Sequence, residues 1–179
     1  PVIVNNSTIL AEVENGTETS HSRITAGDSI GIIAAADSDI YIIAGGLAVA
    51  GANAVGASIN TAILKNDIQA HAGTWTELMT TATPAVQTSS NGIRIPNRNE
   101  RRRGIIIFAN GNEDVIMVSV SAGAGGSNAI TGVINTLVVR NTVKATSREH
   151  VTISVKKASG SSANDTDPLP GVYIEAHDN

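Results

Sequence analysis

The sequence predicts an all-β fold, a right-handed parallel β-helix (β-solenoid) that spans residues 1–179 as a single segment. Three observations favour this fold. A long segment occurs twice at a fixed offset, the apolar residues are mostly small or β-branched, and turn residues interrupt the apolar runs every few positions. Residues that build strands are therefore abundant, whereas strong helix formers such as Leu, Glu, Lys and Gln are scarce.

The repeat is the strongest of these observations. Asp39–Ala70 recurs as Asp114–Ala145, 75 positions later and without a gap. The positions that are identical in both copies are Asp39, Gly51, Asn53, Ala54, Ile59, Asn60, Thr61, Asn66 and Ala70. Other positions keep their character, as where Lys65 is replaced by Arg140. We therefore expect an imperfect 75-residue repeat with copies at about 30–72 and 104–145.

The two ends of the chain resemble parts of further copies, at 1–13 and 171–179. Val4–Ala11 is similar to Leu64–Ala70 with one residue added, and Gly171–Ala176 is similar to Gly31–Ala36. The chain is thus interpreted as a window cut from a longer array.

Composition favours thin β layers over an ordinary globular core. Trp75, Phe108, Tyr41 and Tyr173 are the only aromatic residues among 179, and Ala, Val and Ile supply the apolar fraction. The chain has no cysteine, so neither disulfides nor thiolate metal sites stabilise it, and its net charge of −4 selects no class of partner. The first residues lack a basic start and a cleavage site, so a targeting segment would lie outside this window.

Turn residues divide the sequence into short predicted strands. Breaks are expected at Asn5–Asn6, Asn15–Gly16, Gly27–Asp28, Gly45–Gly46 and Asn66–Asp67. The strands expected between such breaks are 2–13, 24–26, 30–36, 40–43, 47–50, 57–64, 68–72, 93–95, 104–108, 115–120, 130–139, 143–145 and 151–155. Residues 73–91 are expected to form a loop with at most one strand, and residues 96–103 and 158–171 are expected to be polar loops. Coils of such strands, spaced roughly 4.8 Å apart, would number about seven.

Six positions mark the predicted repeat structurally. Asn66 and Asn141 are expected at turns, where their side chains could bond the Asn of the next coil. Gly51 and Gly126 fall at predicted bends, and Asn60 and Asn135 lie deep inside the apolar runs.

The apolar runs also permit a membrane interpretation. Ile40–Leu64 and Val115–Val139 are each long enough for a bilayer-spanning helix and carry no charged residue. Each run nevertheless contains two Asn residues with Ser, Thr and several Gly, and its Val and Ile pairs favour strands. We therefore expect no membrane span.

The order of residues around Ala44-Gly45-Gly46, Asn53-Ala54-Val55-Gly56 and Ile59-Asn60-Thr61 resembles the repeat regions of large secreted bacterial filamentous adhesins. These are the filamentous-haemagglutinin-like and leukotoxin-like proteins exported by two-partner or autotransporter routes. The resemblance covers Ile30–Ala72 and Gly104–Ala145. It implies a β-helical stalk, an extracellular or cell-surface location, and adhesion to host cells or to other bacteria.

No pattern in the sequence predicts an active site or a cofactor. The four histidines His21, His71, His150 and His177 are scattered, and Gly123–Gly126 is not followed by the Lys of a phosphate-binding loop. The carboxylate pairs Asp37/Asp39, Glu113/Asp114 and Asp165/Asp167 could hold Ca²⁺, although solvated turn carboxylates are the simpler interpretation.

A cluster of arginines is the strongest functional signal. It comprises Arg94, Arg98, Arg101, Arg102 and Arg103, opposed within the cluster only by Glu100. Guanidinium groups pair well with sulfate, phosphate and carboxylate, so a candidate polyanion-binding loop is predicted here. No aromatic residue lies among them, which argues against a nucleic-acid partner. The alternative is a solvated loop that keeps the fold soluble.

Three functions remain open from the sequence. The first is a non-enzymatic, adhesive β-helical stalk with loop-mediated binding to a host-cell or glycan receptor. The second is an extracellular filament subunit that stacks head to tail on copies of itself. The third, a carbohydrate-active enzyme on a β-helix, is the weakest, because such sites need clustered acids and aromatic platforms for sugar.

Overall fold

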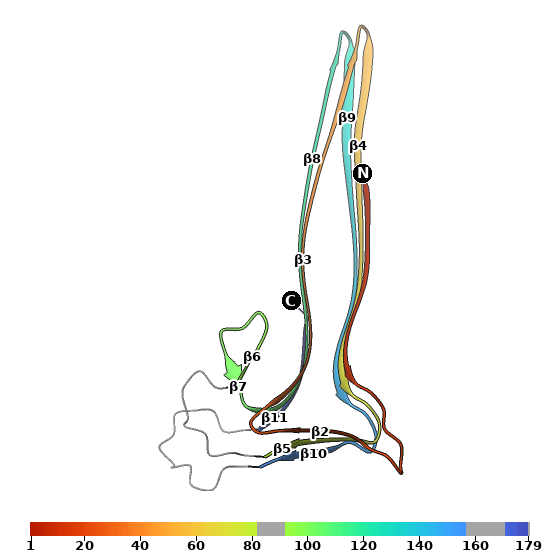
Figure 1. Ribbon diagram of the computed structural model, residues 1–179. Helices are drawn as coiled ribbons and strands as arrows, with labels where there is room; N and C mark the ends of the chain where they lie inside the picture. The colour runs from red at the N-terminus through yellow and green to blue at the C-terminus, as the bar shows by residue number, and fades with distance from the viewer. Residues whose placement is uncertain (82–91, 157–170, 179) are drawn as a thin grey trace.

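The computed structural model describes residues 1–81, 92–156 and 171–178. Every element in these ranges is a β-strand (Figure 1). The strands are β1 (Val2–Val13), β2 (Ser22–Ala26), β3 (Ile30–Ala50), β4 (Asn53–Ala72), β5 (Thr76–Thr80), β6 (Ile93–Arg94), β7 (Arg101–Arg102), β8 (Gly104–Gly125), β9 (Asn128–Ser147), β10 (Thr152–Val155) and β11 (Gly171–Asp178). The expected all-β class is confirmed for the described residues.

Nine of these strands form three parallel sheets of three strands each. The sheets have the orders β1-β4-β9, β2-β5-β10 and β3-β8-β11. The chain visits the three sheets in a fixed cycle, and each return adds one strand beside the strand laid down before. The remaining pair, β6 and β7, is a short antiparallel hairpin.

The offset found in the sequence is the register of the long strand pairs. Ile30 of β3 pairs with Ile105 of β8, and Asn53 of β4 pairs with Asn128 of β9. Each pairing continues without a shift along the whole strand, so residues that match in sequence lie side by side in space.

The terminal strands join the expected sheets with a different alignment. Val4 of β1 pairs with Ile63 without an added residue, and Ile9 pairs with Ile68 as the sequence suggested. At the other end Val172 pairs with Ile105, and Ile105 pairs with Ile30. The sequence similarity of Gly171 to Gly31 therefore predicts a register for β11 that is wrong by two residues. An error of two residues leaves the assignment of inward and outward side chains on the strand unchanged.

The division into many short strands is wrong. Gly45–Gly46 and Asn66–Asp67 lie inside the continuous strands β3 and β4. The expected seven coils are correspondingly replaced by three strands per sheet. Asn66 does not turn the chain because its side chain points inward and is hydrogen-bonded there, and Gly46 lies where the two long sheets approach each other closely.

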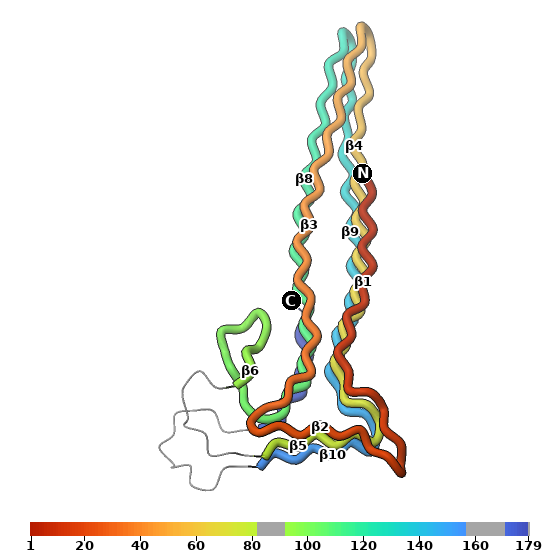
Figure 2. The backbone as a smooth tube through the Cα atoms, viewed as in Figure 1, coloured from red at the N-terminus to blue at the C-terminus, as the bar shows by residue number. Residues whose placement is uncertain are grey.

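The long strands extend beyond the short sheet and form a projection. Figure 1 and Figure 2 show β3 and β8 rising opposite β4 and β9 from the short sheet β2-β5-β10. We call residues 38–66 and 113–141 the blade, and the remainder of the three parallel sheets the base. Inward side chains from all three sheets form the core of the base: Ile30, Ile32, Ala34, Ala36, Ile68, Ala70, Ala72, Leu78, Ile105, Ile107 and Ala109.

The core becomes thinner along the blade. Ile42, Ala62 and Leu64 form a smaller buried cluster above the base. Closer to the tip the inward positions are occupied by Gly46, Ala48, Ala54 and Gly56, which let the two sheets come together. The interior therefore changes from aliphatic at the base to small at the tip, while the alternation of inward and outward residues is kept.

The helical membrane interpretation is wrong for both apolar runs, because their residues lie in β3, β4, β8 and β9. The part of the chain that the structure describes contains no helix with the length and apolar character that a bilayer crossing requires.

Candidate functional site

The arginine cluster lies on the hairpin β6–β7 and at the start of β8. The hairpin packs on the outer face of the β3-β8-β11 sheet, and Asn97 at its turn has a φ of +58°. Ile95 is buried there against Ile106 and Phe108. The predicted charged loop is therefore anchored to the sheet by an apolar contact of its own.

Three of the five arginines are engaged with carboxylates, and two of these, Arg98 and Arg102, share the same pair of acids. Arg98 lies 3.2 Å from Glu100 and 3.6 Å from Glu175, and Arg102 pairs with the same two carboxylates. The hydrogen bond from Arg102 holds the pKa of Glu175 below its ordinary value, although partial burial opposes that shift. These guanidinium groups are thus largely neutralised by groups of the chain itself.

The same two arginines also cover aromatic rings. The Arg102 guanidinium carbon lies 4.6 Å from the centre of the Tyr173 ring, and that of Arg98 lies 5.9 Å from the centre of the Phe108 ring. Cation–π contacts of this kind contribute roughly 0.5–1 kcal/mol each at exposed sites. Arg98 and Arg102 therefore fix the hairpin to the sheet.

Arg103 is the most deeply placed member of the cluster, with 7% of its surface exposed. Its Nε donates to Asp28 Oδ1 at 2.9 Å, and Asp28 precedes it by 75 residues. Burial alone would raise the pKa of Asp28, but the hydrogen bonds from Arg103 and Ser29 outweigh it, so the pKa is lowered. Arg103 is a structural residue that joins two successive turns of the chain.

Arg94 and Arg101 are the exposed members of the cluster. Arg101 donates to the carbonyl of Gly92 at 2.8 Å, and neither residue lies within ion-pair distance of a carboxylate in the described part of the chain. A polyanion that contacts this hairpin would therefore meet two open guanidinium groups rather than five.

The asparagines form inward ladders between the two long sheets. Asn66 is buried in β4, where its Nδ2 donates to Glu113 Oε1 at 2.8 Å and its Oδ1 accepts from Ser7 at 2.6 Å. Asn141 of β9 donates to Glu113 and, at 3.1 Å, to Asp178. Asn66 and Asn141 thus lie in mid-strand, and their prediction as turn residues is wrong.

Asn60 and Asn135 form a second hydrogen-bonded pair of inward asparagines, nearer the blade tip. Asn60 is fully buried, donates to Asn135 Oδ1 at 3.1 Å and also donates to Ser119. Each pair spans the contact between two neighbouring strands 75 residues apart. The ladders fix strand register, because a slip of one residue would move the amides to the solvent side.

Gly51 and Gly126 lie at the blade tip, between β3 and β4 and between β8 and β9. A Cβ at Gly126 would lie 2.3 Å from the Gly51 carbonyl oxygen, which no side chain tolerates. Both glycines lie at bends, as predicted. Gly126 is required because the two bends stack closely, whereas a Cβ at Gly51 would extend into open space.

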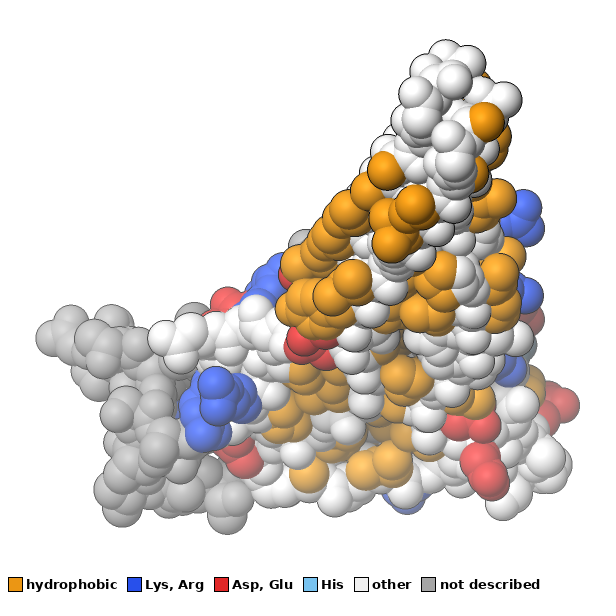
Figure 3. Space-filling model, turned by 90° about the horizontal axis from the view of Figure 1, so that it is seen from above, with side chains coloured by type: hydrophobic (Ala, Val, Ile, Leu, Met, Phe, Trp, Pro, Cys, Tyr) orange, Lys and Arg blue, Asp and Glu red, His pale blue; other side chains and the backbone are white. Residues whose placement is uncertain are grey.

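The outer faces of the blade carry large apolar side chains. Ile43 is 79% exposed and Leu47 77% exposed. The outward exposed set on both faces is Tyr41, Ile43, Leu47, Val49, Val55, Ile59, Ile63, Ile116, Val118, Val120, Ile130, Ile134 and Val138, which we call the blade flanks. Figure 3 shows apolar side chains gathered along the sides of the blade. Apolar surface of this extent is typical of interaction sites.

The sequence analysis did not predict a column of rings at the corner where β1, β4 and β9 are followed by β2, β5 and β10. Trp75 and His150 stack with their ring centres 3.9 Å apart and an interplanar angle of 4°, and His21 lies 5.6 Å from Trp75 on its other side. Trp75 and His150 have φ values of +55° and +56°. Their spacing of 75 residues, which equals the offset of the repeat, is the signal in the sequence that indicates this stack.

Carboxylates of the candidate calcium pairs do not converge in the described residues. Glu113 points inward and Asp114 outward on β8, Asp37 accepts from Asn112 at 2.9 Å, and Asp165/Asp167 lie outside the described residues. Among the described residues no group of three or more His, Asp or Glu side chains could hold a metal ion.

Comparison of the chain with protein-family models, with curated proteins and with solved structures finds no match.

Proposed function

We propose that the chain is a non-enzymatic structural and adhesive segment of an extracellular bacterial filament, folded as a β-solenoid whose blade flanks make the adhesive contact. The observation that supports this most directly is the unbroken parallel register of β3 with β8 and of β4 with β9 over 20 or more residues. Strands added in a fixed cycle over a continuous inner core are how stalks extend without new fold elements.

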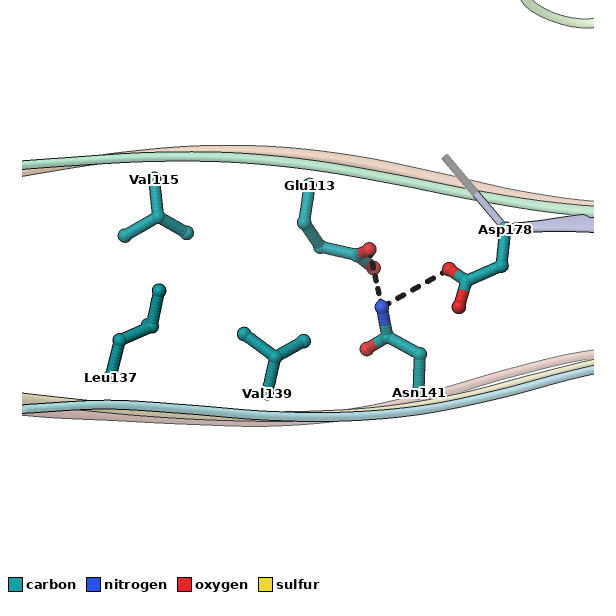
Figure 4. A pocket seen from close by; sticks show the side chains of 6 residues that line it. All are labelled: Glu113, Val115, Leu137, Val139, Asn141 and Asp178. Atoms are coloured by element: carbon teal, nitrogen blue, oxygen red, sulfur yellow. Dashed lines mark hydrogen bonds between the residues drawn. The ribbon is translucent and has the colours of Figure 1, made fainter.

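The polar groups support a structural role as well. Glu113 and Asp178 line the groove shown in Figure 4, and both accept hydrogen bonds from Asn141. Glu77 accepts from Arg23 and His21, and Glu175 accepts from Arg102. An acid or base in catalysis needs a free position beside a substrate, whereas these carboxylates hold strands and corners together.

The adhesive contact is assigned to the blade flanks on the basis of exposure. Burying apolar surface contributes roughly 25 cal/mol per Å², so a receptor or neighbouring cell-surface protein that covers these Ile, Val, Leu and Tyr side chains gains affinity without charge pairing. Arg94 and Arg101 on the hairpin offer a second, electrostatic contact to sulfated glycans or acidic proteins.

Adhesion of cells to beads coated with the chain tests this proposal. We expect Ile43→Ser with Leu47→Ser to reduce the number of attached cells several-fold, because both side chains are exposed and their loss removes contact area without disturbing the core. Arg94→Ser with Arg101→Ser serves as the matched variant for the electrostatic contact, and far-UV circular dichroism checks folding. Unchanged adhesion in both double variants would refute the adhesive role.

A further inference from the structure

One contact that holds the β6–β7 hairpin on its sheet joins an arginine to a histidine. The Arg98 Nη2 atom lies 3.0 Å from Nδ1 and 2.8 Å from Nε2 of His177, and the rings of His177 and Phe108 have their centres 5.6 Å apart. The Arg98 guanidinium carbon also lies over the Phe108 ring. His177 therefore takes part in fixing the charged hairpin to the outer face of the sheet.

This contact requires a neutral imidazole. A guanidinium group only donates hydrogen bonds, so one ring nitrogen of His177 must accept from Arg98. His177 Nε2 lies 3.2 Å from Glu175 Oε2, and an ionised carboxylate only accepts, which places the imidazole proton on Nε2 and leaves Nδ1 as the acceptor. One neutral tautomer thus satisfies both partners, whereas a protonated ring has no lone pair left for Arg98.

The charges around His177 are balanced while the ring is neutral. The charged groups that face it come from the hairpin and from its own strand, and they are Arg98, Glu100, Arg102 and Glu175. Asp178 points to the inner side of β11, where it accepts from Asn141. In the described part of the chain, β8 places only the uncharged Phe108 and Asn110 beside the ring. Two guanidinium groups therefore oppose two carboxylates, and a proton on His177 gives the cluster a net positive charge.

Protonation of the ring displaces Arg98 rather than Glu175. Histidine is the side chain that ordinarily changes charge near neutral pH, and the His177 side chain is 32% exposed, so solvent protons reach it. The added proton removes the acceptor and leaves two cations within 3.0 Å of each other, which repel. The hydrogen bond from Arg102 holds the pKa of Glu175 below its ordinary value, so Glu175 stays ionised and keeps the protonated ring.

We infer that the Arg98–His177 contact is a pH-sensitive latch, and that protonation of His177 releases Arg98 to bind sulfated polyanions together with Arg94 and Arg101. The inference rests on the electrostatic contact of the proposed function and adds its regulation. Sulfate groups pair well with guanidinium groups, so the site offers two open guanidinium groups at neutral pH and three in mild acid. Ile95 remains buried against the sheet, so the hairpin loosens without unfolding.

Two measurements at about pH 7.5 and about pH 5, on either side of the range in which histidines change charge, test the latch. The first is hydrogen exchange of residues 93–103, read by mass spectrometry and corrected for the intrinsic exchange rate. The second is the affinity for heparin at fixed ionic strength. For the wild-type chain we expect exchange in the hairpin to become about tenfold faster at the lower pH, and heparin to bind several-fold more tightly.

Three variants assign the response to one residue. His177→Gln keeps an acceptor for Arg98 but takes up no proton, so its hairpin stays protected and its heparin affinity rises little in acid. His177→Lys carries a charge at both pH values, so it shows fast exchange and tight binding already at about pH 7.5. His150→Asn removes a histidine at the corner beside Trp75 with a residue that tolerates positive φ, and keeps the wild-type response.

The outcomes separate the latch from the proposed function. Equal protection of the hairpin at both pH values in the wild-type chain, or a response that His177→Gln retains in full, overturns the latch and leaves the adhesive role standing. Hairpin exchange that depends on His177 without heparin binding at either pH keeps the latch and overturns its polyanion partner, together with the electrostatic contact. Far-UV circular dichroism checks the folding of each variant, and if His177→Lys does not fold, the Gln and Asn variants decide alone.

Discussion

At the scale of single residues, position in the 75-residue register decides what a polar side chain does. Asp28 and Arg103 are separated by that spacing and form an ion pair, and Asn66 and Asn141 are separated by it and share Glu113 as acceptor. Asparagine by its type alone predicts a turn, but Asn66 and Asn141 lie inside strands and point inward, where they form hydrogen bonds between the two facing sheets. Two predictions follow from such contacts.

The Asp28–Arg103 pair makes stability depend on pH. The pKa of Asp28 is lowered in the folded chain, so its contribution is present above the pKa of an unfolded Asp, about 3.9, and is lost as pH falls through the lower folded value. Asp28→Asn removes the charge at every pH, and we expect it to cost about 1–2 kcal/mol at pH 7. Urea unfolding between pH 7 and pH 3 should show wild type and variant converging at the acid end. A difference that is constant with pH would contradict the ion pair as its source.

The Asn66–Glu113 contact predicts a variant whose stability falls as pH rises, which is opposite to the pH dependence of the Asp28–Arg103 pair. Asn66→Asp replaces the Nδ2 donor with a carboxylate that faces Glu113, which raises the pKa of the new acid in the folded chain. The variant should therefore be most stable below the pKa of an unfolded Asp and lose stability as pH rises, by roughly 2–3 kcal/mol at pH 7. Lys65→Ala, next to it on the outer face, is the control. Equal unfolding midpoints for Asn66→Asp at pH 4 and pH 7, corrected for wild type, would rule out the contact.

At the scale of elements, the long strands depend on small residues where the two sheets meet. A Cβ at Gly46 would lie 2.8 Å from the Ala57 carbonyl oxygen on the facing strand, whereas a Cβ at its neighbour Gly45 would lie 3.8 Å from its nearest atom, the Val120 carbonyl oxygen. From the sequence alone the pair of glycines predicts a strand break, because glycine is unfavourable in strands. The structure shows that one of them instead permits close packing of the blade.

The two glycines should therefore respond differently to the same substitution. Gly46→Val forces the sheets apart and should cost about 1–3 kcal/mol, whereas Gly45→Val points outward and should be neutral or slightly stabilising, since valine favours the strand. Thermal or urea unfolding of the two variants measures the difference. Equal effects would show that the inward and outward faces of β3 are assigned incorrectly at this point.

At the scale of the whole molecule, the 75-residue offset in the sequence equals the register of the long strand pairs, whereas the predicted strand boundaries are wrong. Residues that match without a gap at an offset of 75 are paired with each other in β3 with β8 and in β4 with β9. The strand lengths could not be read locally, because Gly45–Gly46 and Asn66–Asp67 resemble turns until a second sheet lies opposite them. The neutralisation of Arg98 and Arg102 depends on Glu175, more than 70 positions away, so no local pattern indicated it.

The thinning of the core along the blade predicts a gradient of stability. In the base, side chains from three sheets pack around Ile, Leu and Ala residues, while residues near the tip bury only Ala and Gly between two sheets. Local opening should therefore start at the tip, and amide hydrogens of residues 47–57 should exchange with protection at least about 2 kcal/mol lower than those of Ile68–Ala70 and Ile105–Ala109. Hydrogen exchange read by mass spectrometry on dilute chain resolves these segments. Uniform protection from tip to base would mean that the blade unfolds together with the base as one cooperative unit, and would refute the gradient.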